Sequence, residues 1–415
     1  MSNFYIKEAS PEEFFQVEND FQVVNFLQSG EFCQVQLNRD VPRNNQCLLF
    51  YRDSQIVGGC VVHYQRRYKF FLEAVINHGP LINYAENSKD SNFWSGLLSA
   101  LKEYFKSKNV ANLVIAPYLS YRKRNESLEI VVDEENSEII QAFQNSDFKH
   151  LGVTNDIIPV ANQMFIKSIE GISTEDELFE TIDAKTRRSI NKNLEYNIRI
   201  QELGIEEIDK FYEIETATCI RKGFDIQEFS YFHNMKKYFG DKAHFLLATM
   251  DFDEYTSRLK CRLEDFDKEI EKYEAMEQRA KIQRKVKTLK SDRNDFFNKL
   301  NRTLALNDTG EQIIPLSAIL CIETRDEIIY FAGGSYEKFM RFGGTTSIIW
   351  LMLKKALNDK KKAFNFYGTM EVDDAKSSIG NFYFKSQFGG HLVNLIGRFQ
   401  FTYSPLFKLI AKVKG

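Results

Sequence analysis

The sequence predicts an α/β protein, with α+β character, made of two similar units that each hold a mixed β-sheet, plus a helical arm inserted into the second unit. Two observations lead to this prediction. The order strand, strand, helix, strand occurs twice, and a charged stretch without glycine or proline interrupts its second occurrence. We expect the first unit at 1–155, the second at 156–250 and 309–400, the arm at 251–308 and a basic tail at 401–415.

The first unit begins with a hairpin. Residues 47–64 (CLLFYRDSQIVGGCVVHY) read as two strands around a turn at 53–55. Residues 92–109 carry apolar side chains at helical spacing, and 110–119 (VANLVIAPYL) read as a buried strand. The second unit repeats this order, with strands at 243–250 and 314–335, a helix at 345–362 and a strand at 363–368 (AFNFYG).

The arm is predicted from the spacing of its apolar residues. They recur at steps of three and four, which is the pattern of a coiled-coil seam. The seam lapses at 274–281, so we expect two antiparallel helices joined by a tight turn. Each would be roughly 38 Å long at about 1.5 Å per residue.

The composition excludes several classes of protein. With 415 residues the chain is too long for one compact core, and its net charge of −3 leaves any polyanion to local basic patches. The six cysteines are scattered without a CxxC pair, so we expect no disulfide framework, no metal site and no cofactor. Because no apolar run approaches about 18 residues, we expect a soluble protein of the cytoplasm.

Two basic stretches are candidates for contact with phosphates. Residues 279–290 hold six basic and no acidic residues, and 185–200 hold no acidic residue before Glu195. Lysine and arginine displace counterions from a nucleic-acid backbone. The alternative for 279–290 is a solvated helix face that pairs with the acidic half of the arm. The candidate RNA-binding residues are Lys185, Arg187, Arg188, Lys192, Lys281, Arg284, Lys285 and Lys287.

A glycine loop at 331–350 (FAGGSYEKFMRFGGTTSIIW) lies between a strand and a helix. Backbone amides at Gly343 and Gly344, with Arg341 beside them, could hold an anion. This segment resembles the acetyl-CoA loop of the GNAT acyltransferases, whose strand and helix order the chain shares, so we expect two GNAT-like subdomains. The glycines could equally serve only to let the chain enter the helix.

Several segments in order resemble the Fem family of aminoacyl-tRNA-dependent peptidyltransferases, which build peptidoglycan cross-bridges. They are VINHGPLINY, ETATCIRKGF, YFAGGS, NFYG and FKSQFGG. The resemblance covers nearly the whole chain, and the arm is characteristic of FemA-like members. It implies that an amino acid passes from tRNA to the stem-peptide amine of a precursor, either lipid II or a UDP-linked muropeptide. The precursor would lie in the groove between the subdomains.

The resemblance also assigns roles to single residues. Lys385 matches the lysine at the reaction centre, where its charge would stabilise the developing oxyanion. We expect it on an aromatic strand. The implied precursor-binding residues are Tyr231, Gln36, Gln227, Arg221, Phe224 and Tyr367.

Three positions depart from the family pattern. Gln36 and Gln227 stand where the family has a lysine and an arginine that hold the precursor's phosphates, and Ala116 stands where an aspartate is usual. Three alternatives follow: other cations, such as Arg221 or Arg341, replace the missing pair, or the acceptor differs, or activity is lost.

Two other functions stay open at this point. One is a GNAT-like transferase that uses acyl-CoA, and the other is a catalytically altered Fem-like paralogue that acts through partner binding, as a homodimer or with related Fem-like proteins. The basic C-terminal residues Lys408, Lys412 and Lys414 lie beside apolar residues. They would allow peripheral contact with the inner face of the membrane, or would serve only for solubility.

Overall fold

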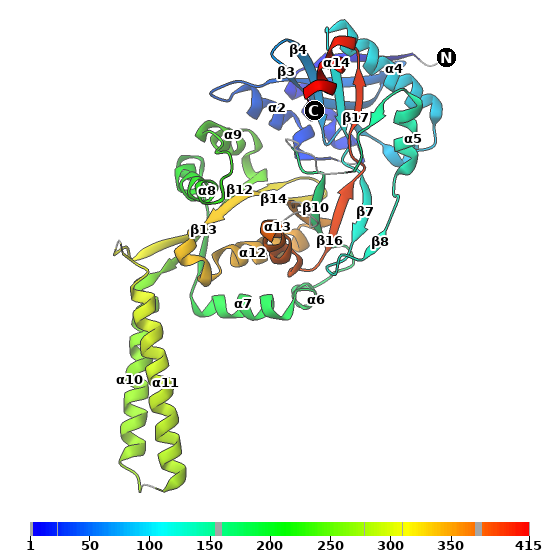
Figure 1. Ribbon diagram of the computed structural model, residues 1–415. Helices are drawn as coiled ribbons and strands as arrows, with labels where there is room; N and C mark the ends of the chain where they lie inside the picture. Colours follow the sequence, from blue (N-terminus) through cyan, green and yellow to red (C-terminus); the bar gives the residue numbers. More distant parts are fainter. Residues whose placement is uncertain are drawn as a thin grey trace.

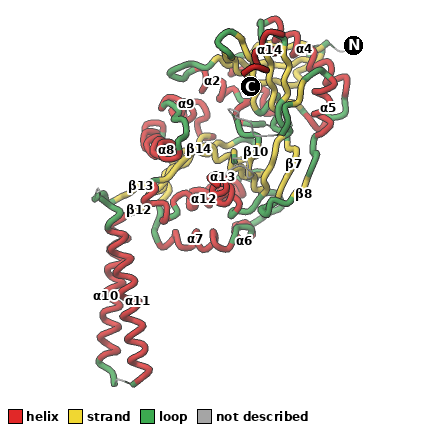
Figure 2. The backbone as a smooth tube through the Cα atoms, viewed as in Figure 1, coloured by secondary structure: helices red, strands yellow, loops and turns green. Residues whose placement is uncertain are grey.

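The computed structural model describes residues 3–22, 24–153, 160–277, 279–308, 310–369 and 376–414. Two mixed β-sheets carry helices on their faces, and a pair of long helices projects from the second sheet (Figure 1). Figure 2 shows that this projection is purely helical, whereas strands and helices are interleaved in the body. The predicted fold class is therefore confirmed.

The first sheet has eight strands. Their order is β1 (Phe4–Ala9), β2 (Asn44–Arg52), β3 (Gln55–Arg67), β4 (Phe71–Asn77), β6 (Asn112–Ala116), β17 (Phe399–Thr402) and β9 (Lys149–His150), with β5 (Leu81–Ile82) on β3. Its helices are α1 (Pro11–Val17), α2 (Gly30–Leu37), α3 (Tyr84–Asn87), α4 (Ser91–Ser107) and α5 (Ser137–Asn145). The Asp90 side chain caps α4 by accepting the Phe93 amide at 3.0 Å. The apolar face of α4 then packs into the core of this half.

The second sheet has nine strands. Their order is β11 (Arg199–Glu202), β12 (Ala243–Asp251), β13 (Ile313–Glu323), β14 (Glu327–Ser335), β15 (Ala363–Gly368), β10 (Gln163–Ser168), β16 (His391–Leu395), β7 (Ser120–Arg124) and β8 (Ile130–Val132). Helices α8 (Ile208–Lys222) and α9 (Phe229–Phe239) share one core cluster with it, and α12 (Gly344–Asn358) belongs to another. The remaining helices are α6 (Glu175–Glu180), α7 (Ala184–Glu195), α13 (Lys376–Ser386) and α14 (Pro405–Lys414).

Both sheets contain the same unit. In the first, three antiparallel strands lead through α4 to β6, which pairs in parallel with β4. In the second, three antiparallel strands lead through α12 to β15, which pairs in parallel with β14. The repeat read from the sequence is thus present, and β4 is a strand that the sequence analysis did not assign.

The sheets exchange segments across the predicted boundaries. β7 and β8 precede residue 155 but lie in the second sheet, and β17 pairs with β6 and β9 of the first. The chain therefore crosses between the halves several times, and this fixes one half against the other. The division at residue 155 stays a prediction about folding units.

The arm consists of α10 (Phe252–Glu274) and α11 (Ala280–Leu304), as the spacing predicted. Near the body its seam residues Tyr255, Leu259 and Leu300 join the core of the second sheet. Farther out, Phe266, Ile270 and Leu289 form a separate small cluster. Among the described residues, no helix is long and apolar enough to cross a bilayer.

Candidate active site

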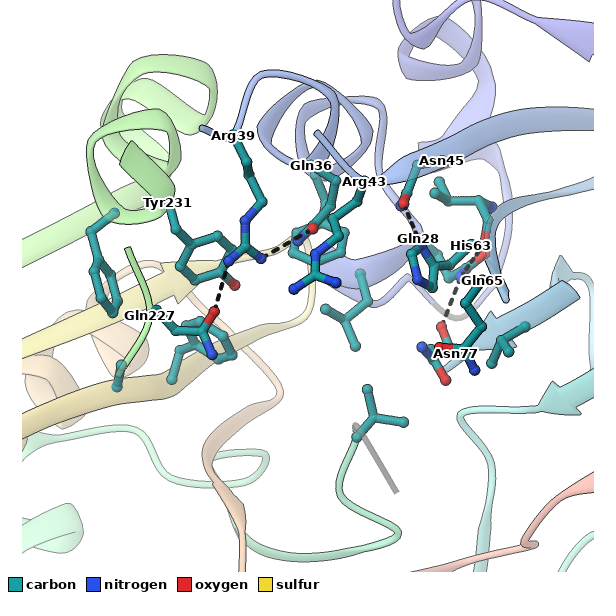
Figure 3. Close-up of a pocket in the computed structure, with 18 of the residues that line it drawn as sticks. Gln28, Gln36, Arg39, Arg43, Asn45, His63, Gln65, Asn77, Gln227 and Tyr231 are labelled. Carbon is teal, nitrogen blue, oxygen red and sulfur yellow. Dashed lines mark hydrogen bonds between the residues drawn. The ribbon is translucent and has the colours of Figure 1, made fainter. Parts of the chain in front are cut away.

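A cavity of about 380 Å³ lies between the two halves of the body (Figure 3). The first half lines it from α2, the loop after α2, and strands β2 to β4. The second half lines it from α8, α9, β14 and β15. The lining residues include Gln28, Gln36, Arg39, Arg43, Asn45, His63, Gln65, Asn77, Glu215, Gln227, Tyr231, Phe331 and Tyr367.

Gln28 holds the wall of the cavity together. Its side-chain amide donates to the carbonyls of Val61 (3.0 Å) and Asn77 (2.7 Å), and its Oε1 accepts the Val61 amide at 2.8 Å. It thus fills a gap between β3 and β4 where the backbones do not pair directly. The next residue, Ser29, caps α2 by accepting the Phe32 amide at 3.1 Å.

Arg39 is the cation that the sequence analysis missed. Its Nε donates to Glu228 at 2.6 Å, its Nη2 to Gln227 at 2.9 Å and its Nη1 to Gln36 at 3.4 Å. The guanidinium lies over the Tyr231 ring at 4.7 Å. Arg39 therefore contacts both glutamines at which the family pattern loses its positive charges (Figure 3).

Arg43 supplies a second cation to the same wall. It is exposed, it lines the cavity, and its side chain makes no hydrogen bond or ion pair with the described part of the chain. Nearby, His63 Nδ1 lies 2.8 Å from the Asn45 Oδ1. Burial, and then Arg43 and Arg39, hold the pKa of His63 below its ordinary value, so this side of the cavity disfavours a third positive charge.

Glu215 is the carboxylate of the cavity. Its Oε1 accepts from the Cys219 thiol at 3.6 Å, and its Oε2 is buried and has no partner of full hydrogen-bond geometry in the described structure, although the Gly333 amide lies near enough to the carboxyl to lower its pKa. Burial raises the pKa of this carboxyl. A buried carboxylate oxygen of this kind would gain from a cationic ligand.

Tyr231 and Tyr367 form an aromatic wall. Tyr231 is 5% exposed on α9, and Tyr367 lies at the end of β15. Tyr367 has φ +58°, a left-handed conformation that is rare for a bulky residue. The backbone is held there because Asn365 Oδ1 accepts the Tyr367 amide at 2.7 Å.

Asn365 belongs to a largely buried polar network. Its Nδ2 donates to the Tyr118 hydroxyl (2.7 Å) and to Glu327 (3.1 Å), and that hydroxyl donates to Glu327 at 2.9 Å. Burial raises the pKa of Glu327 to about 7, opposed by these hydrogen bonds. The network thus links β14 to the conformation of Tyr367 at the cavity.

Lys385 lies on helix α13 and not on a strand, which corrects the sequence analysis. Its aromatic neighbours Phe382 and Phe388 pack α13 into the core of the second sheet, and this burial explains the aromatic composition of the segment. The Lys385 Nζ donates to the Gly368 carbonyl at 2.6 Å and lies 3.5 Å from the Tyr367 carbonyl. It is 6% exposed and does not itself line the cavity.

The charge of Lys385 is finely balanced. Burial first, and then the like charge of Lys222, lower the pKa of its ammonium to about 7. Lys385 therefore changes its charge near neutral pH. Through Gly368 and Tyr367 this lysine holds the backbone next to the aromatic wall.

Three predicted residues lie elsewhere. Arg221 donates to the Ser335 carbonyl at 3.4 Å, Phe224 is 53% exposed, and neither lines the cavity. Arg341 donates to Thr303 at 3.1 Å at the base of the arm. Neither Arg221 nor Arg341 lines the cavity, whereas Arg39 and Arg43 do, so a replacement of the missing charges by Arg221 or Arg341 stays a prediction without support from this arrangement.

The glycine loop is closed by packing. A Cβ at Gly343 would lie 2.6 Å from the Asn193 side chain, and one at Gly344 would lie 2.7 Å from the Ser317 Oγ. Asn193 also donates to the Gly343 carbonyl at 3.0 Å. These contacts favour the simpler interpretation, in which the glycines allow the chain to enter α12.

The candidate RNA-binding residues lie on two surfaces. Lys185, Arg188 and Lys192 are exposed on α7, where Arg187 pairs with Glu180. Lys281, Arg284, Lys285 and Lys287 are exposed toward the free end of the arm. There Lys285 lies 3.8 Å from Glu269 of α10, so part of this basic face pairs with its acidic neighbour.

A second cavity, of about 250 Å³, lies where α7, η5 (Glu337–Phe342) and the arm meet. Its cations are Lys192, Lys299, Arg302 and Arg341, with one carboxylate, Asp295. Burial, together with Lys192 and Arg341, lowers the pKa of Lys299. The described residues hold no group of three or more His, Cys, Asp or Glu side chains placed to bind a metal.

Comparisons with known proteins agree with this arrangement. The model of the FemAB family matches residues 9–414. Aminoacyltransferase FemA of Staphylococcus aureus strain bovine RF122 / ET3-1, and that of strain N315, are each 25% identical over 355 residues, 84% of this chain and 83% of theirs. The crystal structure of FemX superposes with a TM-score of 0.73 at 20% identity, covering 98% of this chain and 99% of that one.

Two mixed sheets that each contain the same strand and helix unit, with an inserted arm, form a duplicated α/β fold, and the FemX structure shares this fold. The chain belongs to the FemAB family. The resemblance drawn from its motifs is thereby confirmed.

We predict that Asn365→Asp destabilises the protein most above neutral pH. The aspartate would keep an acceptor for the Tyr367 amide but would place a second carboxylate against Glu327. Burial already raises the pKa of Glu327 to about 7 in the natural protein, and a second carboxylate would raise it further. Lowering the pH therefore protonates one carboxyl of the pair, so the loss of about 2–3 kcal/mol should shrink toward pH 5. Denaturant unfolding of both proteins at several pH values measures this difference.

The double variant Asn365→Asp/Glu327→Gln is the matched control, because it restores a neutral partner. Its stability should approach that of the natural protein at pH 8. A loss that is equal at pH 5 and pH 8 would contradict a coupled carboxyl pair.

Proposed function

We propose that this protein transfers an aminoacyl group from tRNA to the stem-peptide amine of a peptidoglycan precursor. The observation behind this proposal is the composition of the cavity, which is lined by Arg39 and Arg43 from the first half and by Glu215 from the second. Such a cavity suits a ligand that carries both phosphate and a free amine. A lipid-linked or nucleotide-linked muropeptide carries both groups.

The phosphate contacts come from Arg39 and Arg43. A guanidinium has five N–H groups, and Arg39 uses three of them on Glu228, Gln227 and Gln36. Two N–H groups of Arg39 remain for a phosphate oxygen, and Arg43 adds the N–H groups of its entire guanidinium. The glutamines thus hold an arginine in place where the family pattern has cations of its own.

Glu215 would receive the attacking amine. A stem-peptide ammonium beside its free oxygen would form a charge-assisted hydrogen bond, and the raised pKa of the carboxyl favours acceptance of the ammonium proton. The freed amine then attacks the ester carbonyl of the aminoacyl-tRNA. A C–N bond forms, the ester C–O bond breaks, and the ribose oxygen leaves with a proton.

Lys385 would act beside this reaction. Its ammonium fixes the backbone at Tyr367 and Gly368, next to the cavity wall, and adds a positive charge near the carbonyl oxygen that becomes negative. The activated ester supplies the driving force, so no nucleotide hydrolysis is required. Orientation of two large substrates accounts for much of the acceleration.

The tRNA would contact α7 and the base of the arm. Lys185, Arg188 and Lys192 continue into the cations of the second cavity, which crowd together with one carboxylate among them. Phosphates would relieve this crowding. Because charged tRNA and precursor meet in the cytoplasm, we place the protein there, at the inner face of the membrane when the acceptor is lipid-linked.

The direct test is to incubate the protein with charged tRNAs and a nucleotide-linked precursor, and to measure the mass of the product by mass spectrometry. We expect a mass gain of one aminoacyl residue on the stem peptide with at least one donor. Acetyl-CoA in place of charged tRNA should give none. No gain with any charged tRNA, on either a nucleotide-linked or a lipid-linked precursor, would refute the proposal.

We predict that Arg39→Ala raises KM for the precursor about 10–100-fold and changes kcat less, because a lost phosphate contact weakens ground-state binding. Steady-state kinetics at saturating charged tRNA measures both constants. With a nucleotide-linked precursor in solution, Arg67→Ala is the matched control, because this exposed arginine of the same sheet does not line the cavity. An unchanged KM in Arg39→Ala would remove the arginine from phosphate binding.

We predict that the charge of Lys385 sets an alkaline limit on kcat. As pH rises through about 7 the natural protein loses the ammonium, whereas Lys385→Arg keeps its charge. The ratio of kcat in the natural protein to kcat in Lys385→Arg should therefore fall from pH 6 to pH 9. This ratio cancels the titration of the acceptor amine.

The variant Lys222→Gln provides the control. It removes the like charge that helps to lower the pKa of Lys385, so the alkaline fall should move to higher pH. A ratio that does not change with pH, in a Lys385→Arg protein shown by circular dichroism to be folded, would exclude this role.

A further inference from the structure

Residues 401–415, predicted as a basic tail, contain the end of strand β17 (Phe399–Thr402) and helix α14 (Pro405–Lys414). Phe407 anchors α14 to the turn between β3 and β4. It is 3% exposed, and its ring centroid lies 5.5 Å from those of both Tyr68 and Phe71. Helix α14 therefore lies beside the turn at 66–71 on the first half, and we call the two together the α14 surface.

The α14 surface exposes large apolar side chains. Phe70 at the tip of the turn is 81% exposed, and Val413, Leu409 and Leu406 are 80%, 61% and 57% exposed. The three helical residues are spaced by three and four, so they lie along one stripe of α14. Clustered exposure of this kind marks an interaction surface.

Cations surround the apolar residues. Arg66, Arg67 and Lys69 are exposed at the turn, and Lys408 and Lys412 are exposed on α14. Neither 66–72 nor 403–413 contains an aspartate or glutamate. The surface therefore combines apolar side chains that can enter a lipid layer with charges that anionic headgroups attract.

We propose that the α14 surface docks the protein onto an anionic lipid bilayer. Phe70 and the stripe of α14 enter the headgroup region, and the five cations contact anionic headgroups. A second copy of the chain fits less well, because a symmetric pair would bring these cations against one another.

The position of the surface gives the docking a purpose. Strands β3 and β4 carry His63, Gln65 and Val75 in the cavity, and the same hairpin ends at Phe70. From Gln65 to Phe70 is at most about 17 Å, because five residues span roughly 3.3 Å each when fully extended. A docked tip would hold the cavity close to the headgroups of a lipid-linked acceptor; this purpose rests on the proposed function, whereas the docking itself does not.

The test uses the full chain and vesicles of phosphatidylcholine with or without about one-third phosphatidylglycerol. Co-sedimentation should show binding to the anionic vesicles that weakens with salt, and little binding to phosphatidylcholine alone. Lys408→Glu/Lys412→Glu and Phe70→Asp/Leu409→Asp should each lower the affinity at least about tenfold, from the worth of surface cations and buried apolar area.

Matched controls lie on other surfaces. Lys260→Glu/Lys268→Glu changes two exposed lysines of the arm, and Leu194→Asp changes a leucine of α7 that is 76% exposed. Both should bind within about twofold of the natural protein. Equal losses in controls and α14-surface variants, or no binding of the natural protein to anionic vesicles, would overturn the proposal.

Insertion is measured separately. Brominated lipid should quench the tryptophan fluorescence of Phe70→Trp more than it quenches that of the natural protein. The fluorescence of Leu194→Trp should show no such additional quenching. Analytical ultracentrifugation of Phe70→Asp distinguishes the alternative occupant: a shift to a smaller species with unchanged vesicle binding would assign the surface to self-association and refute docking.

The transferase reaction with a soluble nucleotide-linked precursor separates this inference from the proposed function. The α14-surface variants should keep their rate with that substrate, since none of their changed residues lines the cavity. If these variants lose vesicle binding but keep full transfer to the soluble precursor, docking is supported independently of the reaction. If the natural protein binds vesicles but transfers nothing, the proposed function fails while docking stands.

Discussion

The contact between Arg39 and the segment before α9 is the interaction on which the site depends. Arg39 follows α2 in the first half, yet its guanidinium is held by Glu228 and Gln227 of the second. Its side chain is 7% exposed, so breaking the pair would leave a nearly buried charge without compensation. The residue that joins the halves also lines the cavity between them.

The duplicated unit explains why the cavity lies where it does. Each half ends its antiparallel strands at a parallel pair, and strands exchanged between the sheets hold the two halves in one orientation. The buried network at Glu327 and Asn365 then sets the backbone of Tyr367, and Lys385 fixes the carbonyls beside it. The contacts that position the cavity wall therefore converge on Tyr367 and Gly368 at the end of β15.

Local patterns predicted the fold well. The seam of the arm, the hairpin at 47–64 and the helix at 345–362 depend on the spacing of apolar residues, which the sequence displays directly. The aromatic neighbours of Lys385 favour a strand by local propensity. The structure buries those rings on one side of a helix, a tertiary preference that overrides local propensity.

The site was harder to predict, because its charges come from different parts of the chain. Arg39 lies three residues after Gln36, within one helical turn, and that spacing was the available signal for a replacement cation. Its bond to Glu228 joins residues 189 positions apart, which no local pattern displays. Glu215 lies within the segment ETATCIRKGF, but the burial of its Oε2 depends on tertiary packing, which the sequence does not display.

The central claim is that one ligand bridges the arginines and Glu215. Calorimetric titration with four muropeptides tests it, with the diphosphate present or absent and the stem-peptide amine free or acetylated. Removing either group should weaken binding about tenfold or more, and Glu215→Gln should abolish the effect of acetylation while leaving that of the diphosphate. Affinities that do not respond to either group would contradict this account.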